Sequence, residues 1–386
     1  MNRQLSRFRY SRGLSLIEMM VAVLIASFLI FGLLQVFTAS KASYQTSEGL
    51  ARVQENARFA MEFLQRDIRM AGHFGCVNDQ AHFIREEGDP VNRLTAFAGE
   101  NQPLNFNVSI QGYEANGTAP NQSATIGGFA AGWNPGLPAS INALNPLPGS
   151  DIIVLRYLGA HGTPVGSIGA ANLTITDFDA LTDEGVSSPT LFGIADCSHA
   201  DVFQGAGAAG TIAVASPIAN ELSGRYNPFP AGQTVVYRAN SIVYYVGRGT
   251  SGEPALRRAR ADNSGGYTID EELVEGVESL QFLYGQDETV DISQATPPVG
   301  NITVQNTAAV VLSGAATPDA RANAWRRVGL VQVGILARSP APAAVPAASG
   351  GVNVLGVSFL PPTTGDARFR AGYESTVALR NRLFGN

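Results

Sequence analysis

The feature that most restricts the fold is a long apolar segment near the N-terminus. Residues 14–37 form a run of 24 residues in which Glu18 is the only charged side chain. A helix of this length measures about 36 Å at 1.5 Å per residue, which exceeds the roughly 30 Å hydrocarbon core of a bilayer. The residues before the run include four arginines and no acid, and such a basic flank stays in the cytoplasm. The segment is therefore predicted to enter the membrane, with the rest of the chain outside the cytoplasm.

Glu18 indicates which kind of membrane segment this is. A cleaved secretory signal has an apolar region of about 7 to 15 residues that ends in small residues at a cleavage site, and the run here is longer and has no Ala-x-Ala after it. A plain signal anchor would satisfy the length, but a carboxylate inside an apolar segment costs a few kcal/mol to insert. Snorkelling to the headgroups is an alternative, although the glutamate stem is short. Glu18 is therefore predicted to have a function.

The sequence around Glu18 resembles a known processing signature. Residues 13–22 read GLSLIEMMVA, which is similar to the type IV prepilin signature of pilins and pseudopilins. The resemblance implies that a membrane prepilin peptidase cuts after Gly13, that Leu14 becomes a methylated N-terminus, and that Glu18, the fifth mature residue, is required. Major pilins usually have Phe at the first mature position, so Leu14 suits a minor subunit better.

Cleavage would also give Glu18 a partner. A new N-terminus at Leu14 carries an ammonium group, which a neighbouring subunit shifted along a fibre axis could present to the Glu18 carboxylate. A pair of opposite charges costs less in lipid than a single charge does. The same contact would set the axial register of the subunit in a helical, non-closing assembly.

The helical pattern continues beyond the membrane segment. Apolar residues recur at spacings of three and four within residues 38–72, at Leu50, Val53, Ala57, Met61, Leu64, Ile68 and Ala71. A continuous helix over residues 14–70 would be about 85 Å long, with an apolar lower half and an amphipathic upper half. Gly32 and Gly49 are candidate bend points, because glycine weakens a helix by about 1 kcal/mol relative to alanine.

The rest of the chain has the pattern of a β-rich head. Short β-prone runs alternate with clusters of Gly, Pro and Asn, at residues 151–157, 173–176, 211–215, 234–238, 242–247, 280–284, 328–338, 352–360 and 373–380. Residues 129–150 and 339–351 are rich in Pro, Gly and Ala and are predicted to be long loops. The predicted fold class is therefore α+β, with one long helix packed on a large, mainly antiparallel head. The expected leader, membrane half, amphipathic half and head are residues 1–13, 14–37, 38–72 and 73–386.

Three further segments resemble one family of minor pilins. They are IRMAGHFGC after the helix, LVEGVESLQFLYG in the middle and YESTVALRNR near the end, at residues 68–76, 273–285 and 373–382. Together with the leader they are similar to PilW-type minor pilins. The J-type minor pseudopilin of type II secretion shares the leader and a looser form of the middle segment, but neither of the other two.

The resemblance implies a structural role and no enzymatic one. A PilW-like minor pilin would be held in the bacterial inner membrane with its head in the periplasm, and it would reach the cell surface when assembled in a pilus. Its implied partners are the prepilin peptidase, other minor pilins, the major pilin, the assembly platform and a possible tip adhesin. With the other minor pilins it would initiate and tip a type IV pilus. The alternatives are a J-type pseudopilin and, in a different class, a signal-anchored periplasmic binding protein or hydrolase, which would need neither Gly13 nor Glu18.

The chain has only two cysteines, Cys76 and Cys197, and both lie on the predicted exported side, where disulfides persist. A bridge between them is the favoured interpretation, and it would join the exit of the helix to the β region. Two buried thiols are an alternative. A metal site with Cys197 and His199 is another, but this Cys-x-His pair has no further ligands at a recognisable spacing.

The remaining residue types argue against catalysis, cofactors and nucleic acid. Lys41 is the only lysine and does not belong to a P-loop, and the scattered histidines form no recognisable catalytic motif. A formal net charge of −6, with no basic cluster outside the extreme N-terminus, argues against a nucleic-acid partner. Two acidic clusters could bind Ca²⁺, but they have no EF-hand spacing and are interpreted as solvated loop charges. They are Asp177, Asp179, Asp183 and Glu184, and Asp287, Glu288 and Asp291.

Overall fold

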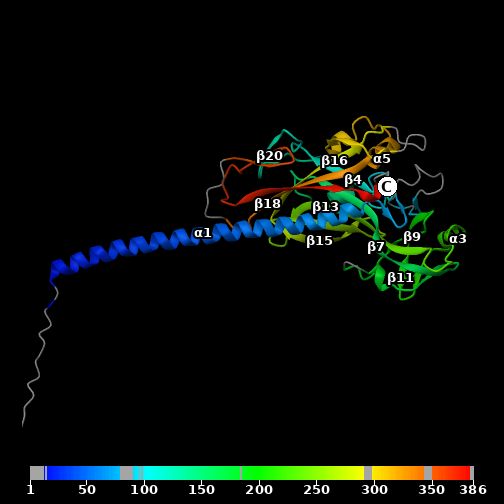
Figure 1. Ribbon diagram of the computed structural model, residues 1–386, viewed down its shortest axis with the longest axis horizontal. Coiled ribbons are helices and arrows are strands. Elements are labelled where there is room, and N and C mark those ends of the chain that lie inside the picture. The colour runs from blue at the N-terminus through cyan, green and yellow to red at the C-terminus, as the bar shows by residue number, and fades with distance from the viewer. Residues whose placement is uncertain are drawn as a thin grey trace, which may run out of the picture.

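The molecule consists of one long helix and a β-rich head (Figure 1). The computed structural model describes residues 13, 15–78, 90–94, 96, 99–182, 185–290, 298–342 and 350–382. The first half of the helix α1 (Leu16–Met70) projects from the head, and the second half runs along it. The predicted fold class is therefore confirmed. Most of the predicted leader, residues 1–12, lies outside the described residues.

Helix α1 runs without interruption over 55 residues. Ser15 precedes it with an extended backbone, and Ala71 follows its last residue. The chain turns away through Gly72, whose φ of 76° lies in the left-handed region that glycine adopts without strain. Gly32 and Gly49 are both inside the helix, so neither predicted bend point breaks it. A single glycine costs less than the cooperative gain of the turns on either side of it.

The two halves of α1 have different surroundings. Along the head, one face of the helix is buried, and its members are Val53, Ala57, Ala60, Leu64, Asp67 and Ile68. Val53, Ala57, Leu64 and Ile68 of the predicted apolar stripe are therefore buried. Met61 is only half-buried and Leu50 is 38 % exposed, whereas Ala60 and Asp67 are buried without having been part of the predicted stripe. No residue of α1 before Val53 is buried.

The larger sheet of the head has twelve strands. They are β3 (Pro90–Asn92), β4 (Ile110–Ala115), β6 (Trp133–Asn134), β7 (Ile152–Ile168), β8 (Asn172–Ile175), β9 (Leu191–Ala195), β10 (Ala200–Gln204), β11 (Ala206–Ala208), β12 (Thr211–Ala213), β13 (Val235–Arg248), β14 (Pro254–Ala261) and β15 (Tyr267–Glu275). The main path runs β11-β12-β8-β7-β13-β9-β10-β3. Off this path, β14 pairs with β13 and β15 with β14, while β4 pairs with β7 and β6 with β4. Only β10 and β3 pair in parallel.

Three smaller sheets and four short helices complete the described head. The four-stranded sheet has the order β17-β16-β18-β21 and is antiparallel, with strands β16 (Val277–Asp287), β17 (Ile302–Asn306), β18 (Val328–Arg338) and β21 (Arg370–Ala378). The others contain β19 (Val352–Val354), β20 (Val357–Leu360) and β5 (Ser123–Thr125), and β1 (His73–Phe74) with β2 (Val77–Asn78). The helices are α2 (Ala139–Asn142), α3 (Ser216–Arg225), α4 (Ala308–Val311) and α5 (Pro318–Arg326).

The main hydrophobic core joins α1 to both large sheets. Leu64 of α1, Tyr244 of β13 and Val333 of β18 belong to one buried cluster. In Figure 1, α1 passes along the head between β18 and β15. Burial of this apolar face is the main source of stability for the contact, and it holds the projecting half of the helix in a defined direction.

The sequence predicts two strands where the structure has one. The runs 234–238 and 242–247 are a single strand, β13. The register against β7 shifts between Tyr237 and Ala239, which indicates a bulge there. A bulge admits an extra residue without ending the strand, so the polar residues between the two runs do not mark a turn.

The reverse error occurs at residues 352–360, which form a hairpin of β19 and β20 and not one strand. Leu355 and Gly356 both have positive φ, at 47° and 84°, and such a residue pair makes a tight hairpin turn. The predicted loop at 129–150 contains the short elements β6 and α2. The central part of the predicted loop at 339–351 lies outside the described residues.

A buried pair of acids joins the two large sheets. Asp151, just before β7, accepts hydrogen bonds from the backbone N–H of Ala115 (2.8 Å) and from that of Phe282 in β16 (2.9 Å). Glu114 of β4 is 6 % exposed and shares a hydrogen bond with Asp151. Burial raises the pKa of both carboxyl groups, and the charge of Asp151 raises the pKa of Glu114 further. The pair therefore keeps a proton at a pH where ordinary carboxyl groups are ionised.

Because the pair holds this proton, we expect the free energy of unfolding of the head to fall as the pH rises. The folded state binds it more tightly than the unfolded chain, so its contribution is fully present below the ordinary glutamate pKa of 4.5 and is lost as the pH rises through the raised pKa. Glu114→Gln keeps a hydrogen-bond donor to Asp151 without a titrating proton. We expect this variant to be more stable than the wild type by about 1 kcal/mol or more at pH 8, and about equally stable at pH 5.

Urea unfolding at the two pH values measures the effect. Glu55→Gln, on the exposed face of α1, is the matched control and should change stability equally at both. A gain for Glu114→Gln that is larger at pH 5 than at pH 8 would contradict the assignment.

Candidate assembly segment and disulfide

The predicted processing site lies at the free end of the molecule, just before α1. Gly13 is exposed, and a Cβ at this position would meet no heavy atom within 4 Å. The fold of the chain therefore does not itself require glycine there. A requirement would come from a peptidase cleft that accepts the backbone closely, where a Cβ would clash. Leu14, on the other side of the predicted scissile bond, lies outside the described residues.

Glu18 lies in the first turn of α1. Its backbone N–H and that of Met19 donate to the carbonyl oxygen of Ser15, at 3.0 and 3.1 Å, which starts the helix at this point. A carboxylate in the first turn is favoured by the positive end of the helix dipole. The Glu18 side chain is exposed and has no ion pair or hydrogen bond with the described residues of its own chain. It is therefore available to a partner from outside.

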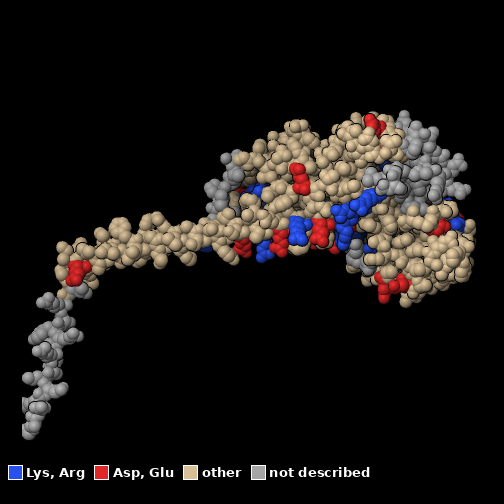
Figure 2. Space-filling view, in the orientation of Figure 1, with Lys and Arg blue, Asp and Glu red and all other residues tan. Residues whose placement is uncertain are grey.

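The apolar half of α1 is uncovered. All of its large apolar side chains are more than half exposed: Leu16, Ile17, Met19, Met20, Val21, Val23, Leu24, Ile25, Phe28, Leu29, Ile30, Phe31, Leu33, Leu34, Val36 and Phe37. This part of the helix is long and apolar enough to cross a membrane, and the head buries none of it. Figure 2 shows it as an uncharged rod with one acidic group near its free end. An apolar surface of this extent is normally covered by lipid or by other subunits.

The head holds the other half of α1 through a buried charge cluster that the helical pattern did not predict. Asp67, 1 % exposed, accepts hydrogen bonds at Oδ2 from the Tyr244 hydroxyl (2.5 Å) and from Arg258 Nη1 (3.0 Å). Arg258 also pairs with Glu271 of β15 at 2.8 Å. Burial, together with the nearby Asp67 charge, raises the pKa of Tyr244 well above its usual value, so the phenol stays a donor. The cluster ties α1 to three strands of the larger sheet.

The turn between β15 and β16 is a second attachment point for α1. Asn56 Nδ2 donates to the carbonyl oxygen of Glu275 at 2.9 Å. The next residue, Gly276, has a φ of 84°, and a Cβ there would lie 2.8 Å from the carbonyl oxygen of Arg338. The Glu278 carboxylate accepts hydrogen bonds from Arg338 Nη1 (2.8 Å) and Arg370 Nε (2.6 Å). The Glu-Gly-Val-Glu segment therefore links the helix to β18 and β21.

The C-terminal segment also contacts the end of α1. Gln65 Nε2 donates to the Ser375 hydroxyl in β21 at 2.7 Å. Asn381, in the short 3₁₀ helix η3 (Arg380–Arg382), donates from Nδ2 to the carbonyl oxygen of Arg69 at 3.0 Å. Local sequence patterns could not predict either contact, because more than 300 residues separate the two partners.

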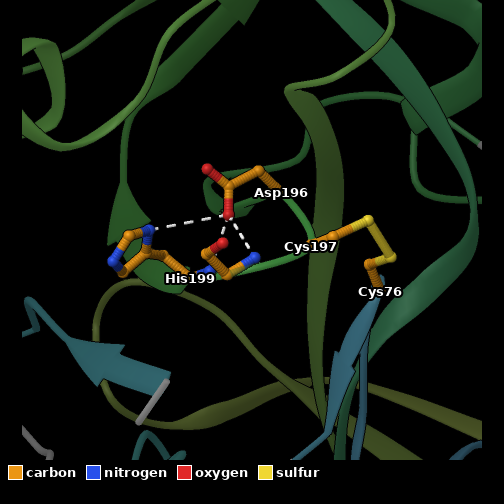
Figure 3. Close-up of a disulfide and its surroundings, with 5 residues drawn as sticks. Cys76, Asp196, Cys197 and His199 are labelled. Atoms are coloured by element: carbon orange, nitrogen blue, oxygen red, sulfur yellow. Dashed lines mark hydrogen bonds and ion pairs between the residues drawn. A yellow bond between two sulfur atoms is a disulfide. The ribbon is translucent and has the colours of Figure 1, made fainter. Parts of the chain in front are cut away.

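Cys76 and Cys197 form a disulfide, with a Cα–Cα distance of 4.7 Å (Figure 3). Cys76 lies between β1 and β2, directly after α1, and Cys197 lies in the loop between β9 and β10. Asp196 orders this loop, because its Oδ1 accepts hydrogen bonds from the backbone N–H of Ser198 (2.7 Å) and His199 (2.6 Å). The bridge thus joins the exit of the helix to the larger sheet, as predicted.

The alternatives for the cysteines and acids have no support in the structure. The disulfide occupies the sulfur of Cys197, so neither two buried thiols nor a ligand pair with His199 remains. Within the described ranges, no three His, Cys, Asp or Glu side chains are grouped so that they could hold a metal ion. Asp183, Glu184 and Asp291 of the predicted acidic clusters lie outside the described residues.

The structure thus combines a projecting apolar helix, an exposed glycine before it, a glutamate in its first turn and a β-rich head, which is the arrangement that the resemblance to type IV pilins implies. Residues 8–34 match the family model of the prokaryotic N-terminal methylation motif. Residues 243–381 match the family model of the Type IV Pilus-assembly protein W. The two matches make the chain similar to PilW-type type IV pilins at both ends, and they support a minor pilin or pseudopilin. No curated protein and no solved structure matches it significantly.

The PilW match covers part of the head only. It extends from within β13 to η3 and includes Glu275 and Asn381, which bond α1, and Glu278, which joins β16 to β18 and β21. The disulfide and residues 99–111 lie outside both matched regions. The matched part therefore includes much of the attachment of the head to the helix.

Proposed function

We propose that the chain is a non-enzymatic minor pilin, which prepilin peptidase processes after Gly13 and which enters the complex that initiates and tips a type IV pilus. The observation that carries the proposal is the uncovered apolar half of α1, with Glu18 as its only charge. In this proposal residues 14–37 first anchor the subunit in the membrane and later lie among other helices in the filament. Residues 38–72 form the support of the head, which comprises residues 73–386.

The location and partners follow from the same proposal. The processed subunit would be held in the inner membrane with its head in the periplasm, and it would reach the cell surface within the pilus. Its partners would be the prepilin peptidase, other minor pilins, the major pilin, the assembly platform and a possible tip adhesin. The match to the pilus-assembly family favours this over the J-type pseudopilin of a secretion system.

The chemistry of Glu18 supports incorporation into a helical fibre. Cleavage before Leu14 releases an ammonium group, and Glu18 has no described partner in its own chain. A neighbour displaced along the fibre axis would bring its ammonium group to this carboxylate. The resulting pair fixes the axial position of one subunit relative to the next.

Processing is tested by the substitution Gly13→Val. We expect the wild-type chain from peptidase-competent cells to begin at an N-methylated Leu14, and the variant to keep its leader while remaining in the membrane. Intact-mass measurement of the purified chains distinguishes the two forms. Gly32→Val is the matched control, because Gly32 is equally free of neighbouring atoms within the same chain, and it should be processed normally.

Two outcomes would refute the proposal. A wild-type chain that begins at Met1 in peptidase-competent cells would remove the processing step. A chain cleaved after residue 37 would show that the apolar segment is an ordinary signal.

A further inference from the structure

A candidate binding site lies in the head, apart from the assembly segment. A pocket of about 370 Å³ opens between residues 99–111 and helix α5. This volume is within the range of pockets that hold small organic ligands. In Figure 1, α5 and β4 lie on the part of the head that is remote from the projecting half of α1, so burial of that half would leave the pocket accessible.

Carboxamide side chains dominate the polar lining of the pocket: Asn101, Asn105, Asn107, Gln111 and Asn323. Asn105 is only 8 % exposed, yet its carboxamide makes no hydrogen bond with the described part of the chain. Gln111 is 5 % exposed and donates from Nε2 to Asn101 Oδ1 at 2.5 Å, which leaves its Oε1 without a described partner. These groups retain donors and acceptors that a ligand can use.

The lining of the pocket carries equal numbers of acidic and basic side chains, and the Glu100–Arg321 ion pair lies at its rim. Two acids, Glu100 and Asp319, face two bases, Arg321 and Arg326. Glu100 accepts two hydrogen bonds from Arg321, and the remaining nitrogen of Arg321 donates to the carbonyl oxygens of Ala315 and Ala316. The hydrogen bonds from Arg321 lower the pKa of Glu100, so the carboxylate stays ionised and paired. The protein itself thus uses four of the five N–H donors of the guanidinium, which offers little to an anionic ligand.

Apolar atoms form the remaining wall. Val108, Leu312 and Trp325 contribute to it. Trp325 is 2 % exposed and packs with its edge against the ring of Tyr284, at a centroid distance of 5.0 Å. This packing fixes the wall, because the indole cannot rotate without displacing a buried tyrosine.

We propose that this pocket binds a neutral saccharide. Each carboxamide offers a donor and an acceptor, which matches the hydroxyl groups of a sugar ring, and the apolar wall suits the C–H face of the ring. A phosphate or carboxylate would need an unpaired cation. Arg321 is held by Glu100, and Arg326 donates from Nη1 to Asn323 Oδ1 at 3.2 Å, so neither base provides one. The pocket shares no residue with the projecting half of α1, so the proposed binding does not rest on the proposed function in pilus assembly.

The test uses the full processed chain in lauryl dimethylamine oxide, a detergent without a sugar headgroup. Saturation-transfer NMR titrations with lactose, maltose and N,N′-diacetylchitobiose measure binding, and 3′-sialyllactose and acetyl-trialanine amide serve as the charged and peptide probes. We expect at least one neutral disaccharide to bind with a Kd of about 5 mM or tighter, and more tightly than either of the other probes.

Three variants connect the binding to the pocket. Asn105→Ala/Asn323→Ala removes two carboxamides and should weaken binding about tenfold. Ala322→Trp fills the pocket from α5, removes no carboxamide and should weaken binding at least as much. Asn220→Ala removes an exposed carboxamide from α3 and should have no effect. Equal melting temperatures exclude loss of fold for each variant. The proposal is overturned if no neutral disaccharide binds, if the peptide or the acidic sugar binds more tightly, or if both pocket variants bind like the wild type.

Discussion

Replacement of Glu18 by alanine is expected to reduce incorporation of the subunit into pili by two orders of magnitude or more, while insertion into the membrane remains at least as efficient as in the wild type. Insertion improves because the substitution removes a charge from an apolar segment. Incorporation falls because the ammonium group of a neighbouring subunit loses its partner in the filament core. Breaking a buried ion pair typically costs about 3 to 5 kcal/mol, and every 1.4 kcal/mol is about a factor of ten.

The measurement is the ratio of the variant in sheared pili to the variant in the membrane fraction, with intact-mass confirmation that it is processed. Glu48→Ala is the matched control, because Glu48 is an exposed glutamate of the same helix outside the apolar half. It should enter pili normally. A processed Glu18→Ala subunit that enters pili at the wild-type level would mean that Glu18 is no assembly contact, and the plain signal anchor would then be the better interpretation.

The double substitution Cys76→Ala/Cys197→Ala is expected to lower the free energy of unfolding of the head by about 5 kcal/mol. The bridge closes a loop with a sequence separation of 121 residues, and in the chain-entropy model a loop of that length strongly restricts the unfolded chain. Both cysteines are exposed, so the substitutions leave no cavity in the core. For a head of this size the loss corresponds to a fall of about 5 to 10 °C in melting temperature.

Thermal unfolding followed by circular dichroism measures this loss. Wild-type protein with excess reductant is the control, and it should melt at the same temperature as the double variant. If the double variant melts within about 2 °C of the oxidised wild type, the disulfide contributes little to stability.

The sequence predicts the helix and the assembly segment well, because both depend on neighbouring residues. The helical spacing of the apolar residues and the length of the apolar run are enough to predict an apolar helical half followed by an amphipathic half. The structure has both halves in α1. The pairing of the cysteines is also predictable from the sequence, because two exported cysteines can form only one intramolecular bridge. The sequence predicts Val328–Arg338 at the observed bounds of β18, because nine of its residues are apolar or small and an arginine lies at each end of the run.

Strands with charged side chains could not be predicted in this way. β14 and β15 carry Arg258, Arg260 and Glu271, and their sequence has neither an apolar run nor strict alternation. The charges are compatible with a sheet because they meet across the strands: Arg258 lies opposite Glu271 in the register of the two strands. Only the register reveals this pairing, and the register depends on the fold.

The buried polar residues were missed for a related reason. Asp67 interrupts the apolar face of α1 and resembles a solvated helix charge, yet it is buried because Arg258 lies against it from a position 191 residues later. Asp151 and Glu114 likewise share one proton only because β4 and β7 are neighbours. Partners so distant leave no local signal in the sequence, and a charge without its partner is always interpreted as exposed.

The position of the disulfide affects how the chain responds to mechanical load. Once tension along α1 has pulled the helix from the head, it passes through the chain beyond Met70 and meets Cys76 six residues later. From there the bridge carries the load directly to Cys197, so the chain between the two cysteines is not pulled taut even when the head unravels. At about 3.4 Å per residue, roughly 400 Å of contour length is withheld from extension. An oxidised subunit that is stretched between its ends therefore lengthens far less than a reduced one.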